Sequence, residues 1–271
     1  MFLARFVVAA LLSSPDFRPG IRLVAGALAW TLATMAIYVF NGIADRVEDR
    51  ANGSTRPISS GRLAVPHAVG GALAAGLLGL PLGLFAGGPA ELVPLLAFLA
   101  AGYAYSGAPF RGKRHGASAS ALVLVLGAAT YAGGWCVGGR GDTSPVLVLG
   151  AAMSLWMALV GAVVKDLSDV EGDRVAGRRT PVIVWGQTPT RIVASANALL
   201  VGGGYLAAAL CWAPALAPSA GVVLGGAAVL AVLTALTRHS IDRGERRRPY
   251  RAFMVTQYLA HALALLWLAA N

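Results

Sequence analysis

Two segments of this chain carry closely similar arrangements of acidic and basic residues. Asp45 and Asp49 stand four residues apart in the first segment, Asp169 and Asp173 do so in the second, and matched positions are 124 residues apart. In both segments an Arg follows the second Asp, a Gly stands four residues after that Asp, and a Pro stands four residues after the Gly. This repetition indicates two related halves that share a function.

The acidic side chains of the protein are concentrated in these segments, which hold seven of its 12 acidic residues: Asp45, Glu48, Asp49, Asp166, Asp169, Glu171 and Asp173. If one helix continues to Asp49, the i, i+4, i+8 spacing places Asn41 and both Asp of the first segment on one face. Carboxylates so close together repel each other unless a cation lies between them. Oxygen ligands favour hard cations such as Mg²⁺, which binds through a few carboxylates plus substrate phosphate. We therefore predict a site for two or three Mg²⁺ with a diphosphate between the two Asp pairs.

A short basic loop, from Tyr105 to Arg114, could supply groups of the opposite charge. Its Arg and Lys side chains are suited to hold phosphate oxygens, Arg in a bidentate manner and Lys as a point charge. Comparable candidates flank the second Asp pair: Lys165, Arg178 and Arg179. The alternative is that all these residues serve only the orientation of the chain in a membrane.

The composition places the chain in a bilayer, because 57% of its residues are hydrophobic, 13% are charged, and the mean hydropathy is +0.67. Apolar windows that could span a membrane run at about 21–40, 67–87, 91–107, 118–138, 146–165, 191–212, 218–237 and 250–270. Residues 1–14 are apolar but short; we favour a curtailed first helix over a signal peptide. The sequence thus predicts an all-α polytopic membrane protein with eight to nine transmembrane helices, as one domain over residues 1–271.

The basic residues predict the orientation of the chain. With nine helices and the N-terminus inside, one side of the membrane holds 18 of the 22 Lys and Arg. Such loops stay in the cytoplasm, so both Asp segments face it, in an inner or plasma membrane of bacterial type. The net charge of +10 then reflects topology and attraction for anionic lipid or substrate, and it does not indicate a nucleic-acid partner.

The two segments and the basic loop resemble motifs of one family. Asn41-Gly-Ile-Ala-Asp45-Arg-Val-Glu-Asp49, followed by Arg56-Pro57-Ile-Ser-Ser-Gly61, resembles the first Asp motif of the UbiA superfamily of membrane prenyltransferases, and Lys165-Asp-Leu-Ser-Asp169-Val-Glu-Gly-Asp173 resembles the second. The loop from Tyr105 to Arg114 is similar to that of the chlorophyll synthase and homogentisate prenyltransferase branch. Gly42 and Ala108 depart from the family pattern, which has Asp and often Pro there.

The resemblance implies a helical bundle around a central cavity and a set of site residues. Asp45, Asp49, Asp169 and Asp173 would bind Mg²⁺, and Asn41 would support them. The diphosphate would be held by Tyr105, Arg111, Lys113 and Arg114, with help from Arg178 or Arg179.

The implied activity is Mg²⁺-dependent transfer of a prenyl group from an isoprenyl diphosphate to an aromatic or lipophilic acceptor through an allylic carbocation. One alternative is a membrane terpene cyclase, which ionises the same diphosphate without an acceptor. A transporter built on an internal repeat is a further alternative, but it would place ionisable residues near the bilayer midplane, whereas these acids lie at helix ends on one side.

Overall fold

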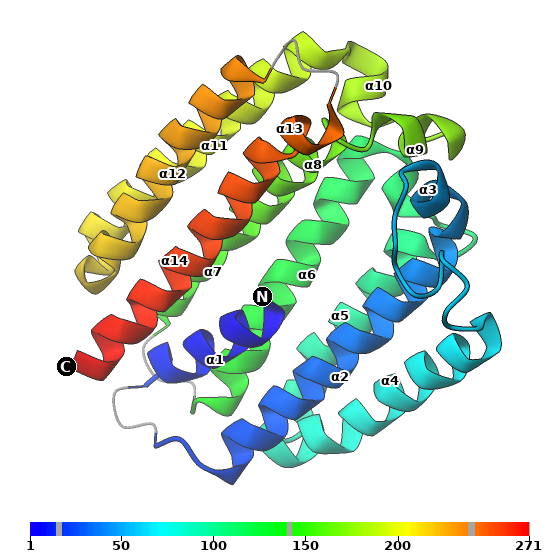
Figure 1. Cartoon of the computed structure of the whole chain (residues 1–271). Helices are drawn as coiled ribbons and strands as arrows, with labels where there is room; N and C mark the ends of the chain where they lie inside the picture. Colours follow the sequence, from blue (N-terminus) through cyan, green and yellow to red (C-terminus); the bar gives the residue numbers. More distant parts are fainter. Residues whose placement is uncertain (15–17, 140–142, 238–241, 271) are drawn as a thin grey trace.

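The structure, a computed structural model, describes residues 1–14, 18–139, 143–237 and 242–270. Long helices lie side by side in a bundle, and short helices from the connecting loops gather at one end of it (Figure 1). The described residues contain no β-strand beyond one isolated bridge between His115 and Arg179. The predicted all-α class is confirmed.

The helices follow the predicted apolar windows. The long ones are α2 (Ile21–Ala44), α4 (Val65–Gly87), α5 (Pro89–Ser106), α6 (Gly116–Val137), α11 (Gln187–Trp212), α12 (Ala217–Leu236) and α14 (Arg248–Ala270). A further rod is made of α7 (Ser144–Leu155), the π-helical turn η2 (Trp156–Gly161) and α8 (Ala162–Asp166). The first helix, α1 (Phe2–Leu12), is short, as expected. Six helical stretches among the described residues are long and apolar enough to cross a membrane, so the chain is an integral membrane protein, whereas the count of eight to nine spans stays a prediction.

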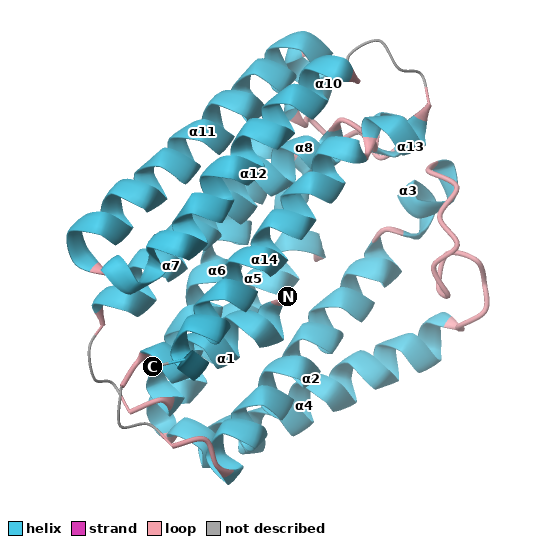
Figure 2. Cartoon of the chain, turned by 60° about the vertical axis from the view of Figure 1, so that its left-hand side comes forward, coloured by secondary structure: helices cyan, strands magenta, loops and turns pink. Residues whose placement is uncertain are grey.

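The short helices occupy the loops. At the end of the bundle where α2 and α8 finish lie α3 (Arg46–Ala51), η1 (Gly112–Arg114), α9 (Val170–Val175), α10 (Pro181–Trp185) and α13 (Arg243–Arg246). Figure 2 shows α3, α10 and α13 at this same end from a second direction. The remaining short helix, η3 (Pro214–Leu216), precedes α12. The two Asp segments are thus presented together at one end.

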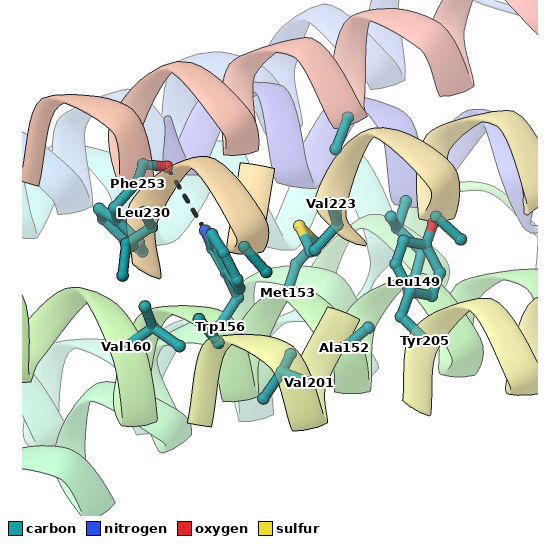
Figure 3. Close-up of a cluster of buried hydrophobic side chains, with 14 of the residues drawn as sticks. Leu149, Ala152, Met153, Trp156, Val160, Val201, Tyr205, Val223, Leu230 and Phe253 are labelled. Atoms are coloured by element: carbon teal, nitrogen blue, oxygen red, sulfur yellow. Dashed lines mark hydrogen bonds between the residues drawn. The ribbon is translucent and has the colours of Figure 1, made fainter. Parts of the chain in front are cut away.

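Two hydrophobic clusters make up the core of the bundle, and α1 and α6 contribute buried residues to both. Trp30 and Phe98 lie in the cluster of α2 and α5, and Trp156 lies in the cluster of α7, α11, α12 and α14. In the second cluster the Trp156 indole Nε1 donates a hydrogen bond of 3.4 Å to the carbonyl of Phe253 (Figure 3). Met157, in the π-helical turn, packs against both clusters, so this turn lies where they meet.

Close approach of α1 to α6 depends on two glycines spaced four residues apart. A Cβ added at Gly134 would lie 2.2 Å from the carbonyl oxygen of Phe6, and one at Gly138 would lie 2.2 Å from that of Ala10. Small residues at this spacing let helix backbones touch in lipid. Not every glycine acts in this way, because a Cβ at Gly225 in α12 would meet nothing within 4 Å.

We expect Gly134→Ala to destabilise the protein, because the methyl group would collide with the α1 backbone and force the helices apart. Overpacking of this kind costs about 1–3 kcal/mol. Gly225→Ala is the matched control, since it adds the same methyl group to a helix with open space around it. Thermal unfolding of the purified proteins in detergent checks this; equal melting temperatures for the two variants would contradict the packing account.

Candidate active site

Each Asp segment begins where a long helix is interrupted at an aspartate. Asp45 (φ −91°, ψ 7°) separates α2 from α3, and Asp169 (φ −108°, ψ 18°) lies between α8 and α9. Both residues adopt the sparsely populated bridge conformation in which many active-site residues are found. The condition that one helix continues to Asp49 is therefore not met, and the second segment is interrupted in the same way. A new helical turn starts at each break, with the amide of Asp49 bonded to the carbonyl of Asp45 at 2.7 Å and that of Asp173 to the carbonyl of Asp169 at 2.9 Å.

The segments also end alike. Gly53 and Gly177 both have φ of +63°, a left-handed conformation that glycine adopts without steric cost at helix C-termini. The following amides, of Ser54 and Arg178, reach back to the carbonyls of the second Asp of each segment at 2.8 and 2.9 Å. The sequence repeat is thus a repeat of backbone structure, and its glycines have a conformational reason.

Arg178 brings the two segments together. Its guanidinium contacts Asp45 of the first segment at 3.0 Å and Asp173 of the second at 3.3 Å, and it also bonds to Glu48. Arg178 is only 7% exposed and Asp173 only 2%. Carboxylates from both halves of the chain therefore meet on one buried cation. Glu48, which was not among the predicted ligands, belongs to this group.

Lys113 and Asn41 complete the first half of the site. Lys113 forms a buried ion pair with Asp45 and donates a hydrogen bond of 3.2 Å to the hydroxyl of Ser106. The Asn41 amide donates to Asp45 at 2.9 Å and accepts from Ser106 at 2.6 Å. The structure thus gathers these two predicted residues around the first Asp, and Ser106 is an addition that no motif singled out.

The second half of the site is held by two cations from different elements. The Lys165 ammonium lies 3.2 Å from one carboxylate oxygen of Asp169, and the Arg243 guanidinium, from α13, lies 2.9 Å from the other. Sequence reasoning missed Arg243, because it stands in a run of basic residues with no motif around it. In the first segment Asp49 pairs with the exposed Arg56 at 3.2 Å.

Three of the predicted phosphate-binding residues, Arg111, Arg114 and Arg179, are exposed. Within the described ranges no hydrogen bond or ion pair of their side chains is found. Main-chain bonds instead join the basic loop to the second segment: the Arg179 amide donates to the Arg114 carbonyl at 2.6 Å, and Gly116 donates to the Arg179 carbonyl at 3.2 Å. The loop is in the predicted place, and the phosphate contacts of these three side chains stay predictions.

Tyr105 lies beside the charged cluster. With Lys113, Lys165, Asp166 and Arg178 it lines a cavity of about 30 Å³, which is large enough to hold water. The cations of the cluster therefore face a common space beside Tyr105.

Burial and close charges perturb the ionisation of the first segment. Burial opposes the charge on Asp45, but a hydrogen bond from Glu48 and the cations of Lys113 and Arg178 hold the pKa of Asp45 below its usual value. For Glu48, burial followed by the hydrogen bond and charge of Asp45 raises the pKa to about 7. The pKa values of these two neighbouring carboxyl groups are thus shifted in opposite directions.

The donor chemistry of the site fits a hard divalent cation. All the acidic groups offer oxygen, and the Oδ2 atom of the buried Asp173 has no hydrogen-bond partner in the described part of the chain. Within that part, no three Asp, Glu, His or Cys side chains gather in an arrangement that could hold a metal ion, and Arg178 contacts both Asp45 and Asp173. A metal ion would have to take over positions that this guanidinium now satisfies.

Comparisons with known proteins agree with the predicted family and fold. The profile of the UbiA prenyltransferase family matches residues 2–267. The digeranylgeranylglyceryl phosphate synthase of Methanoregula boonei is 31% identical over 218 residues, covering 75% of this chain and 74% of that protein. The chloroplastic 2-acylphloroglucinol 4-prenyltransferase of Humulus lupulus is 30% identical over 243 residues, covering 86% and 58%.

Among solved structures, a UbiA homologue from Archaeoglobus fulgidus bound to GPP and Mg²⁺ superposes with a TM-score of 0.74. The two are 18% identical, and the match covers 99% of this chain and 95% of that one. This likeness concerns the fold.

We expect Arg178→Gln to destabilise the protein strongly, because it leaves Asp45, Glu48 and Asp173 without their shared cation. Removing one partner from a buried charge cluster costs about 3–5 kcal/mol. The neighbouring substitution Arg179→Gln is the control, since it removes an exposed charge one residue away. Melting temperatures measured without divalent cations check this prediction. A change no larger for Arg178→Gln than for Arg179→Gln would mean that the cluster does not hold the segments together.

Proposed function

The chain belongs to the UbiA prenyltransferase family, and we propose that it catalyses Mg²⁺-dependent transfer of a prenyl group from an isoprenyl diphosphate to an aromatic or lipophilic acceptor. One observation carries the proposal: Asp45 and Asp173, one from each segment, converge on the same buried guanidinium of Arg178. Acidic and basic groups held together in this way form a site that suits both a metal ion and a diphosphate.

The cations of the site have two possible partners, the carboxylates and a diphosphate. In the structure Lys113 and Arg178 satisfy the Asp45 carboxylate. When Mg²⁺ is bound, it would act as a Lewis acid that neutralises the leaving diphosphate. The carboxylates would then need fewer protein cations, and Lys113 and Arg178 would be available to phosphate oxygens. We assign the carboxylates of Asp45, Asp49, Asp169 and Asp173 to metal binding, with Asn41 orienting Asp45.

The reaction follows from the charge that these groups neutralise. The bond between the first prenyl carbon and the diphosphate oxygen breaks, and its electron pair leaves with the diphosphate. An allylic cation remains, and an electron-rich atom of the acceptor attacks it and then loses a proton. The apolar helices below the charged end keep water from capturing the cation. We place this site on the cytoplasmic side, because the loops at the same end carry most of the basic residues.

The relatives do not point to one acceptor, because one is named for a glyceryl phosphate lipid and the other for a phloroglucinol. The donor chain length and the acceptor are accordingly matters for direct assay. The same assay distinguishes a cyclase from a transferase, because a cyclase releases a hydrocarbon or alcohol from the diphosphate without an acceptor.

We expect purified protein in nanodiscs to release diphosphate from geranyl, farnesyl or geranylgeranyl diphosphate when Mg²⁺ and an acceptor from an aromatic and lipid panel are present. Asp45→Asn and Asp173→Asn should each lower the rate by about 10²-fold or more, since each removes a charge that holds the metal and the diphosphate. Glu245→Gln in α13 is the control, because its carboxylate pairs with Arg248 outside the two segments. Turnover that survives both Asp substitutions, or that needs no divalent cation, would contradict the proposed site.

A further inference from the structure

Arg243 contacts both Asp segments although it belongs to neither. It is the first residue of α13, which lies at the same end of the bundle as α3 and α9 (Figure 1). Its three guanidinium nitrogens donate to the Asp169 carboxylate at 2.9 Å, to the carbonyl of Asn52 at 2.6 Å and to the carbonyl of Ser168 at 3.2 Å. Asn52 ends α3 in the first half of the chain, so a single side chain joins the halves through a third loop.

Asn52 makes a second connection across the same junction. Its side-chain oxygen accepts a hydrogen bond of 3.0 Å from the amide of Gly172 in α9. A Cβ at Gly172 would lie 2.1 Å from the Asn52 amide nitrogen, so a larger residue there would push α3 and α9 apart. Arg243 therefore bonds to the main chain of Asn52, and Gly172 bonds to the side chain of Asn52.

The contact also fixes the orientation of Asp169. Arg243 binds one carboxylate oxygen, and Lys165, four residues earlier in the same segment, binds the other. A guanidinium is a planar fork with five donors, so it can bond in several fixed directions at once, whereas an ammonium acts as a point charge. The three nitrogens of the fork satisfy Asp169 and the two carbonyls at the same time.

We propose that Arg243 is a positioning residue of the active site, which clasps the Asn52 end of the first segment to Asp169 of the second. It sets the distance between α3 and α9 and orients Asp169, so that the carboxylates of both halves reach one metal–diphosphate group. The metal part of this inference rests on the proposed function; the clasp rests on the contacts alone. Residues that orient metal ligands typically contribute 10–100-fold to metal affinity or activity.

The first test is kinetic. Arg243→Gln should raise the Mg²⁺ concentration for half-maximal diphosphate release about 10–100-fold, and Arg243→Lys should give an intermediate value because it keeps the charge and loses the fork. Arg248→Gln is the control, since it removes a nearby exposed charge that bonds only to Glu245 among the described contacts. Equal Mg²⁺ dependence in Arg243→Gln and Arg248→Gln would overturn the proposal.

The second test does not depend on activity. Val47 in α3 and Val175 in α9 are exposed, and spin labels can be attached there through cysteine substitutions after the native Cys136 and Cys211 are replaced by alanine. Pulsed electron spin resonance should give a narrow distance distribution for the parent and Arg248→Gln, and a broader one for Arg243→Gln. An unchanged distribution in Arg243→Gln would refute the clasp. If the wild type turns over no prenyl diphosphate, the proposed function fails, and this distance measurement still decides whether Arg243 positions the segments.

Discussion

The site depends on one buried interaction, the guanidinium of Arg178 between carboxylates of the two Asp segments. Carboxylates taken out of water repel each other, and placing Asp45, Glu48 and Asp173 together costs free energy unless a cation lies among them. Arg178 meets that requirement in the protein alone. The same arrangement explains why the site suits a charged ligand: the cluster already balances acidic and basic groups, and a metal ion with a diphosphate brings in the same two kinds of charge.

The rest of the fold serves to bring the two segments to one place. Each segment follows a long helix, breaks at an aspartate and closes on a left-handed glycine, Gly53 or Gly177. The helices behind them form two hydrophobic clusters, and Met157 in the π-helical turn contacts both. Such turns inside helices are frequent near functional sites, and this one lies directly before α8, which carries Lys165 and Asp166 toward the site.

Much of this arrangement could be predicted from the sequence, because it follows from periodicity and repetition. The apolar windows predicted the helices to within a few residues, and the repeat pointed to Asp45 and Asp173. The basic loop pointed to Lys113, and the basic residues beside the second Asp pair pointed to Arg178. The breaks at Asp45 and Asp169 were not predicted, since a spacing of four residues looks the same in a continuous and an interrupted helix. Arg243 was missed because its contacts depend on the path of the chain from α12 to α14, which no local pattern encodes.

A structure of the full chain with Mg²⁺ and a non-hydrolysable prenyl thiodiphosphate tests the central claim most directly. The account predicts that the diphosphate group lies between α3 and α9, that metal ions contact Asp45 and Asp173 together, and that Arg178 has moved from Asp45 toward the phosphate oxygens. A diphosphate bound elsewhere, or metal ions held by one segment while Arg178 still bridges Asp45 and Asp173, would contradict the account.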